Sequence, residues 1–116
     1  MLGESQLGAA IGGIRLHEDL SHSIVDMWGE IDGALRPEAS AALARALDRD
    51  LPVVIDTSRV TFIDSTGIAF LVQFYTIGRE EGLQVTLRNP PTVVSDVLAM
   101  LGVDDFLNRV PLSSTR

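Results

Sequence analysis

The sequence predicts a single α/β domain whose mixed, mostly parallel sheet of four to five strands is flanked by helices. Two neighbouring runs near the N-terminus alternate apolar and polar residues, as an antiparallel strand pair with one wet face does. In three later segments apolar residues recur at helical spacing, and strand-like runs separate these segments. The chain has 116 residues, 46% of them hydrophobic. That is enough for one such core and leaves little room for a second domain.

The N-terminal part predicts a lead-in followed by the two alternating strands. Residues 1–13 are rich in Gly, Ala and Ser, and we expect a flexible lead-in there, with the folded domain spanning residues 14–116. The alternating runs cover residues 14–18 and 24–30, and a short polar turn separates them. Their order implies an antiparallel pair.

Helices and strands alternate through the remainder of the chain. The segment 52–56 is almost wholly apolar, which is typical of a central strand buried on both faces. Alternation of this kind implies right-handed crossovers and a mostly parallel sheet. The predicted helices cover residues 37–48, 65–81 and 91–101, and the predicted strands cover 52–56, 83–87 and 106–110.

Composition excludes several classes of protein. The net charge of −7 disfavours binding to nucleic acid or to anionic lipid. All nine basic residues are arginines, whereas a Walker-A loop, a Schiff-base site and a Ser-Lys hydrolase each need a lysine. The sequence has no cysteine, no apolar run long enough to span a bilayer and no secretory signal. We therefore expect a cytoplasmic protein.

The most informative segment leads from the strand at 52–56 through a predicted loop to Asp64, Ser65 and Thr66 at the start of a helix. Free backbone N–H groups and the positive end of the helix dipole converge at such a position, so a phosphate carried by Ser65 would be stabilised there. Gly67 leaves room for another backbone to approach the helix start. The alternative is that one of these polar residues only caps the helix, which is common and contributes about 1 kcal/mol.

Two motifs resemble a known family. The pattern D-x-S-x-V-x-F-I-D-S-T-G-I over residues 56–68 resembles the STAS domain, and within it the bacterial anti-sigma-factor antagonists. A second motif, Gly-Glu-Ile-Asp at residues 29–32, closes the second predicted strand as a similar motif does in that family. The resemblance extends over about residues 14–110, which is nearly the whole predicted domain.

The resemblance implies a switch that works through binding. An unphosphorylated antagonist binds an anti-sigma factor, a serine kinase of the histidine-kinase-like ATPase class, and so frees a sigma factor for stress-response transcription. The kinase then phosphorylates the serine after the motif aspartate, here Ser65 with Thr66 as the minor alternative, and a serine phosphatase restores the binding form. The protein is expected to be a monomer or a weak dimer. The implied partner-binding surface consists of Asp32, Gly33, Asp64, Ser65, Thr66, Gly67 and Ile68.

Other functions have weaker support in the sequence. A STAS scaffold or adaptor subunit of a stress-signalling or transporter complex is the main alternative, and nucleotide binding would lack a phosphate loop. His17 and His22 lie far from Ser65 in the sequence, and no Gly-x-Ser-x-Gly elbow is present. Asp56 ends a strand as a phosphatase nucleophile would, but Ser58 stands where the second acid is expected. We expect neither an enzyme nor a metal or cofactor site.

Overall fold

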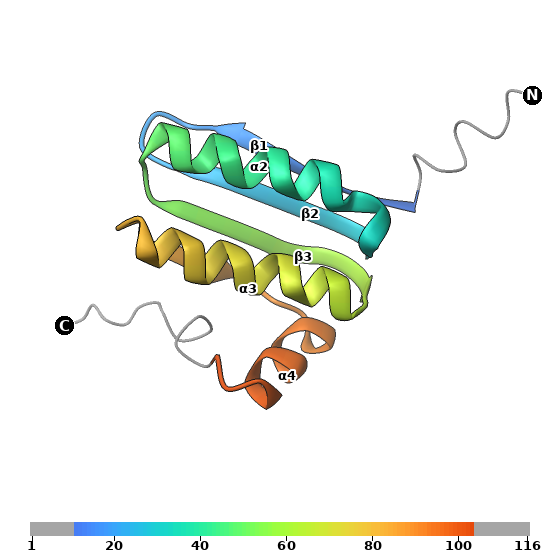
Figure 1. The fold of residues 1–116 in the computed structure, drawn as a ribbon. Helices are drawn as coiled ribbons and strands as arrows, with labels where there is room; N and C mark the ends of the chain where they lie inside the picture. The colour runs from blue at the N-terminus through green and yellow to red at the C-terminus, as the bar shows by residue number, and fades with distance from the viewer. Residues whose placement is uncertain (1–10, 104–116) are drawn as a thin grey trace, which may run out of the picture.

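A four-stranded sheet with helices packed against it forms the structure, a computed structural model that describes residues 11–103 (Figure 1). The strand order is β1-β2-β3-β4. β1 runs antiparallel to β2, whereas β2, β3 and β4 are parallel, so the predicted fold class is confirmed. The elements are β1 (Gly12–Glu18), β2 (Ser23–Ile31), the 3-10 helix η1 (Gly33–Leu35), α2 (Arg36–Arg49), β3 (Val53–Ile63), α3 (Ser65–Glu80), β4 (Val85–Arg88) and α4 (Thr92–Met100).

The first two strands form the expected antiparallel pair with one open face. Val25 and Met27 are fully buried on the side that the helices cover, while Trp28 is half-buried on the other side. β1 begins at Gly12, two residues before the predicted start, because Gly13 pairs with Trp28 and lies under its ring. A Cβ atom at Gly13 would lie 2.3 Å from a ring carbon of Trp28, so a glycine belongs inside this strand.

The third strand differs most from the prediction. β3 continues through residues 57–63, which the sequence predicts as a loop, and pairs with β2 as far as Ile63. Two register shifts interrupt this pairing and break the alternation that would have revealed the strand. The prediction that the strand at residues 52–56 is buried on both faces is also wrong. Val53 and Ile55 are buried, but Val54, on the other face, is only half-buried.

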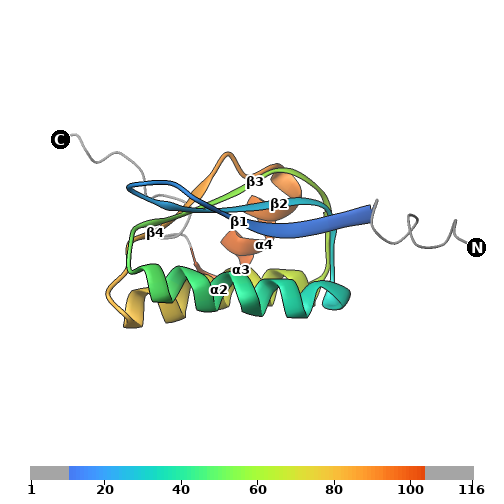
Figure 2. The ribbon, with the colours of Figure 1, turned by 90° about the horizontal axis from the view of Figure 1, so that it is seen from above.

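The helices explain this one-sided burial. α2 and α3 run along the same side of the sheet, and the opposite face carries no helix over β1 and β2 (Figure 2). α4 lies beside α3 on the side away from α2 (Figure 1). After the end of α3, the Leu83 amide donates a hydrogen bond to the Gly78 carbonyl at 2.8 Å, and β4 starts at Val85, two residues after its predicted start.

Some predictions fall on residues outside the described range. Residues 1–10 of the predicted lead-in and the predicted strand at 106–110 belong to this group. Between residues 11 and 103, no helix has the length and apolarity needed to cross a bilayer.

Arg49 joins α2 to the β1–β2 hairpin. Its guanidinium donates hydrogen bonds to the His22 carbonyl at 2.7 Å and to Ser23 Oγ at 3.0 Å, and also to the Asp19 carbonyl. The side chain is only 12% exposed. Ser23 is fully buried, so losing the guanidinium would take a donor from its hydroxyl, whereas the His22 carbonyl would still accept from the Asp19 amide at 3.1 Å.

We expect Arg49→Met to lower the free energy of unfolding by about 2 kcal/mol, since charge-assisted hydrogen bonds contribute about 1.5–3 kcal/mol each and the methionine recovers some packing. Urea denaturation measures the change. Arg45→Met is the matched control, because Arg45 pairs with Glu18 and Asp48 at the surface. If Arg49→Met lowers the free energy of unfolding no more than Arg45→Met does, Arg49 does not stabilise the contact between α2 and the β1–β2 hairpin.

At Thr57 we expect a substitution to stabilise the protein rather than to destabilise it. Its side chain is fully buried, and within the described residues its Oγ1 has no hydrogen-bond partner. Replacing this hydroxyl with a methyl group in Thr57→Val is expected to stabilise the protein by about 1 kcal/mol. Thermal melting of Thr57→Val and Thr57→Ser tests this, because the serine keeps the hydroxyl and should destabilise. A lower melting temperature for the valine variant would show that the hydroxyl has a partner in solution.

Candidate functional site

The carboxyl ends of β2 and β3 lie side by side and bring two aspartates together. Ile31 and Ile63 are paired in the parallel register, and Asp32 and Asp64 each follow directly. The Asp64 amide donates a hydrogen bond to the Ile31 carbonyl at 3.2 Å. Two segments that are far apart in the sequence therefore form one edge of the sheet, and both contribute to the partner-binding surface that the resemblance implies.

Each aspartate caps a helix. The Asp32 carboxylate accepts a hydrogen bond from the Ala34 amide at 3.0 Å and starts η1. The Asp64 carboxylate accepts one from the Gly67 amide at 2.9 Å and starts α3. The sequence left open which polar residue caps α3, and the structure assigns the cap to Asp64. The hydroxyl groups that follow are not needed for that purpose.

Ser65 and Thr66 differ in exposure. Ser65 is the first residue of α3 and is exposed, whereas Thr66 is half-buried. The Thr66 methyl group lies 3.7 Å from the place that a Cβ atom at Gly33 would occupy, so Thr66 faces the start of η1. Ser65 is therefore the more accessible hydroxyl, at the helix end where backbone amides and the dipole favour an anion.

Gly67 holds the start of α3 against the sheet. A Cβ atom at Gly67 would lie 2.6 Å from the Ile31 carbonyl oxygen and 2.6 Å from Ile63 Cγ1. The expected close approach of another backbone is confirmed, and that backbone is the end of β2. Gly67 and Ile68 are both buried. Of the seven residues expected at the partner surface, these two are the buried ones.

The surface around Ser65 is acidic. Within residues 11–103 neither Asp32 nor Asp64 forms an ion pair with an arginine, because the ion pairs of this range involve other acids. Arg36 follows Asp32 closely in the sequence, but its guanidinium lies over the ring of Phe70, 5.8 Å from the ring centroid. A further negative charge on Ser65 would meet two carboxylates that no arginine of residues 11–103 neutralises.

The other candidate groups lie elsewhere. His17 is 3.8 Å from Asp26, and His22 contacts Ser21 in the β1–β2 turn, so both histidines are at the opposite end of β2 from Asp32. In the described part of the chain, no three His, Cys, Asp or Glu side chains are grouped to hold a metal ion. Nothing in that part supplies Ser65 with a histidine base.

Asp56 is part of the open sheet face rather than of the Ser65 site. Partial burial would raise the pKa of its carboxyl, but hydrogen bonds from the amide and hydroxyl of Ser58 outweigh this effect, and Arg88 at 3.2 Å adds to them. The pKa therefore lies below its usual value. On the next strand Asp26 pairs with Arg59 at 2.6 Å. These pairs neutralise the two acids within the open face.

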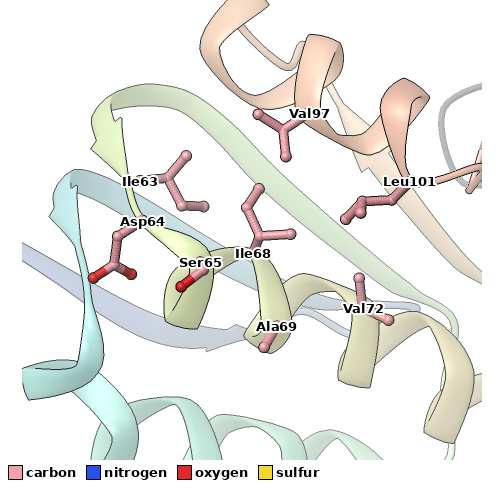
Figure 3. Close-up of a pocket in the computed structure, with 8 residues that line it drawn as sticks. All are labelled: Ile63, Asp64, Ser65, Ile68, Ala69, Val72, Val97 and Leu101. Carbon is pink, nitrogen blue, oxygen red and sulfur yellow. The ribbon is translucent and has the colours of Figure 1, made fainter.

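An apolar groove next to Ser65 is the feature that the sequence did not reveal. It lies between α3 and α4 and has a volume of about 550 Å³ (Figure 3). The apolar stripe of α4 predicts that Val97 and Leu101 share a face, but periodicity does not distinguish a packed core from an open groove. The lining residues are Ile63, Asp64, Ser65, Ile68, Ala69, Val72, Val97 and Leu101.

Comparison with protein families matches residues 14–110 to the family model described as "Mlab, STAS domain". None of the curated proteins is similar enough to match. Among solved structures, an anti-sigma factor antagonist from Mycobacterium paratuberculosis is 26% identical, with a TM-score of 0.66; the match covers 87% of this chain and 86% of that one.

Two further structures share the fold. The anti-sigma factor antagonist SpoIIAA in its unphosphorylated form has a TM-score of 0.71 at 16% identity, with 87% of this chain and 90% of that chain covered. The antisigma-factor antagonist STAS domain from Rhodobacter sphaeroides has a TM-score of 0.53 at 23% identity, with 69% and 88% covered. At these identities the likeness establishes the fold alone.

We expect Gly67→Ala to destabilise the protein by about 1–3 kcal/mol, because the added methyl group meets a backbone carbonyl that has little freedom to move. Gly33→Ala is the matched control, since its added methyl group would make only an ordinary contact with Thr66. Chemical denaturation of both variants measures the difference. Equal stability of the two variants would mean that α3 does not approach β2 as closely as described.

Proposed function

Because the chain belongs to the STAS domain family, we propose that it is an anti-sigma-factor antagonist controlled by phosphorylation of Ser65. Unphosphorylated, it binds an anti-sigma factor that is a serine kinase of the histidine-kinase-like ATPase class, and a sigma factor is freed. Phosphorylation of Ser65 by that kinase ends the complex, and a serine phosphatase restores the binding form. The observation that carries this proposal is the exposed Ser65 hydroxyl at the start of α3, beside an aspartate that already provides the cap.

Two further findings support the proposal. The 26% identical structure is that of an anti-sigma factor antagonist, and the match covers most of both chains. The site also has the chemistry of a modified surface rather than of a catalytic centre. Both histidines of the sequence lie on the hairpin at the other end of β2, which supports a role for Ser65 as the substrate of another enzyme rather than as a nucleophile.

Electrostatics explains why a phosphate would end the complex. A phosphoserine carries about −1.5 to −2 charges at neutral pH. In the free protein, water screens its repulsion from Asp32 and Asp64. A bound partner removes that water, and the repulsion grows as the local dielectric constant falls. Reversing a preference from 1:99 to 99:1 takes about 5.5 kcal/mol, and desolvating a doubly charged group supplies energy on that scale.

Ser65 rather than Thr66 is the proposed acceptor. A kinase must bring the γ-phosphate in line with the attacking hydroxyl, which requires an accessible side chain. Thr66 is half-buried against the start of η1, so its modification would require the helix start to move.

Incubation with candidate anti-sigma kinases and ATP, followed by phosphosite mapping by mass spectrometry, tests the proposal. We expect phosphate on Ser65 of the wild type and none in Ser65→Ala. Thr66→Val should be phosphorylated to the same extent as the wild type. Ser65→Asp should bind the kinase at least tenfold more weakly than Ser65→Ala, because it places a permanent charge at the contact.

The controls separate this role from its main alternative. Ser65→Asn adds a side chain of similar size without charge and should bind much more tightly than Ser65→Asp. If no kinase modifies Ser65, or if Ser65→Asp binds as tightly as the wild type, the phosphorylation switch is wrong. A STAS adaptor that works without modification would then be the better account.

A further inference from the structure

We propose that the groove between α3 and α4 receives an amphipathic helix of the anti-sigma factor, with the apolar face of that helix in the groove and a basic side chain toward Asp64 and Asp32. This inference rests on the function proposed above and specifies the partner surface and the way in which phosphate acts on it. Asp64 and Ser65 form one end of the groove, so it is continuous with the phosphorylation site (Figure 3).

The groove walls select an apolar occupant. Across the groove, Ile68 and Val72 of α3 face Val97 of α4 and Leu101, which caps the end of that helix (Figure 3). Leu101 is 56% exposed, which is unusual for a leucine in a wall made of other apolar side chains. A groove between two helices is also the shape that accepts the apolar side of a third helix. Burial of these walls would supply the affinity.

The charges at one end select the orientation of the occupant. Away from Asp64 and Ser65 the lining is apolar, and neither Asp64 nor Asp32 is paired with an arginine of the described residues. A lysine or arginine at the corresponding end of the partner helix would complement both carboxylates. An acidic helix would be repelled there, and a neutral one would gain nothing from this end.

Phosphorylation of Ser65 would release even a basic helix, because the cost of covering the phosphate is larger than its attraction to the basic side chain. A covered ion pair between the phosphate and the partner's basic side chain attracts more strongly than an exposed one, but the cost of desolvating both charges can exceed that gain. Covering a doubly charged phosphate with an apolar helix costs several kcal/mol in desolvation. Since Ser65 lines the groove, the helix cannot take its place without covering the phosphate. The desolvation cost therefore dominates.

The test measures the affinity of full-length variants for the anti-sigma kinase that phosphorylates Ser65. Leu101→Glu places a charge in the groove wall, and Met100→Glu adds the same charge one residue away, at a side chain that is 83% exposed and outside the groove. We expect Leu101→Glu to bind at least tenfold more weakly and Met100→Glu to bind within twofold of the wild type. Circular dichroism confirms that both variants are folded.

A second pair of variants changes volume without changing charge. Ala69→Trp fills the groove and should weaken binding, whereas Gln73→Trp on an exposed, non-lining position of the same helix should not.

Asp32→Asn keeps a side chain able to cap η1 but removes one charge. We expect its affinity for the kinase to fall about twofold to fivefold, and this difference to shrink at high salt.

The outcomes distinguish the two proposals. If Ser65→Asp releases the kinase but Leu101→Glu and Ala69→Trp bind like the wild type, the groove proposal is overturned and the proposed function stands. If the wild type binds no anti-sigma kinase, the proposed function fails, and the groove proposal falls with it. A shift in the monomer–dimer equilibrium of Leu101→Glu with unchanged kinase binding would assign the groove to a second copy of the chain and overturn the proposal.

Discussion

The close packing of Gly67 against the end of β2 is the constraint on which the site depends. With no room for a Cβ atom beside the Ile31 carbonyl, the first turn of α3 must start at one place on the sheet. The Asp64 amide bonds to the same carbonyl, and its carboxylate turns back to the Gly67 amide. This arrangement leaves Ser65 outside and buries Ile68 beneath it. A local packing requirement thus decides which hydroxyl faces the solvent.

The same helix start combines properties that oppose each other. Backbone amides at the beginning of α3 favour an anion on Ser65, so the proposed phosphate would be stabilised there in the free protein. The uncompensated carboxylates of Asp32 and Asp64 and the apolar groove make that anion costly once a partner removes the water. The open sheet face differs, because Asp26 and Asp56 are each paired with an arginine. Within residues 11–103, the two aspartates at the helix starts have no such arginine partner.

Much of the fold follows from residue patterns that a sequence displays directly. The alternation around Val25 and Met27 predicts the wet face of the first strand pair, and the helix order predicts the parallel part of the sheet. The second half of β3 escapes prediction because polar residues and register shifts at 57–61 disrupt its alternation. The capping role of Asp64 and the openness of the groove depend on where helices pack in space. The periodicity of apolar residues along the chain does not show how the helices pack against one another.

The central claim is that one phosphate on Ser65 decides whether a partner remains bound. The most direct measurement is the equilibrium affinity of the anti-sigma kinase for the same preparation of protein before and after stoichiometric phosphorylation, with the phosphosite verified by mass spectrometry. The account predicts an affinity at least tenfold lower for the Ser65-phosphorylated protein, restored when a phosphatase removes the phosphate. Equal affinities for the two forms would contradict it.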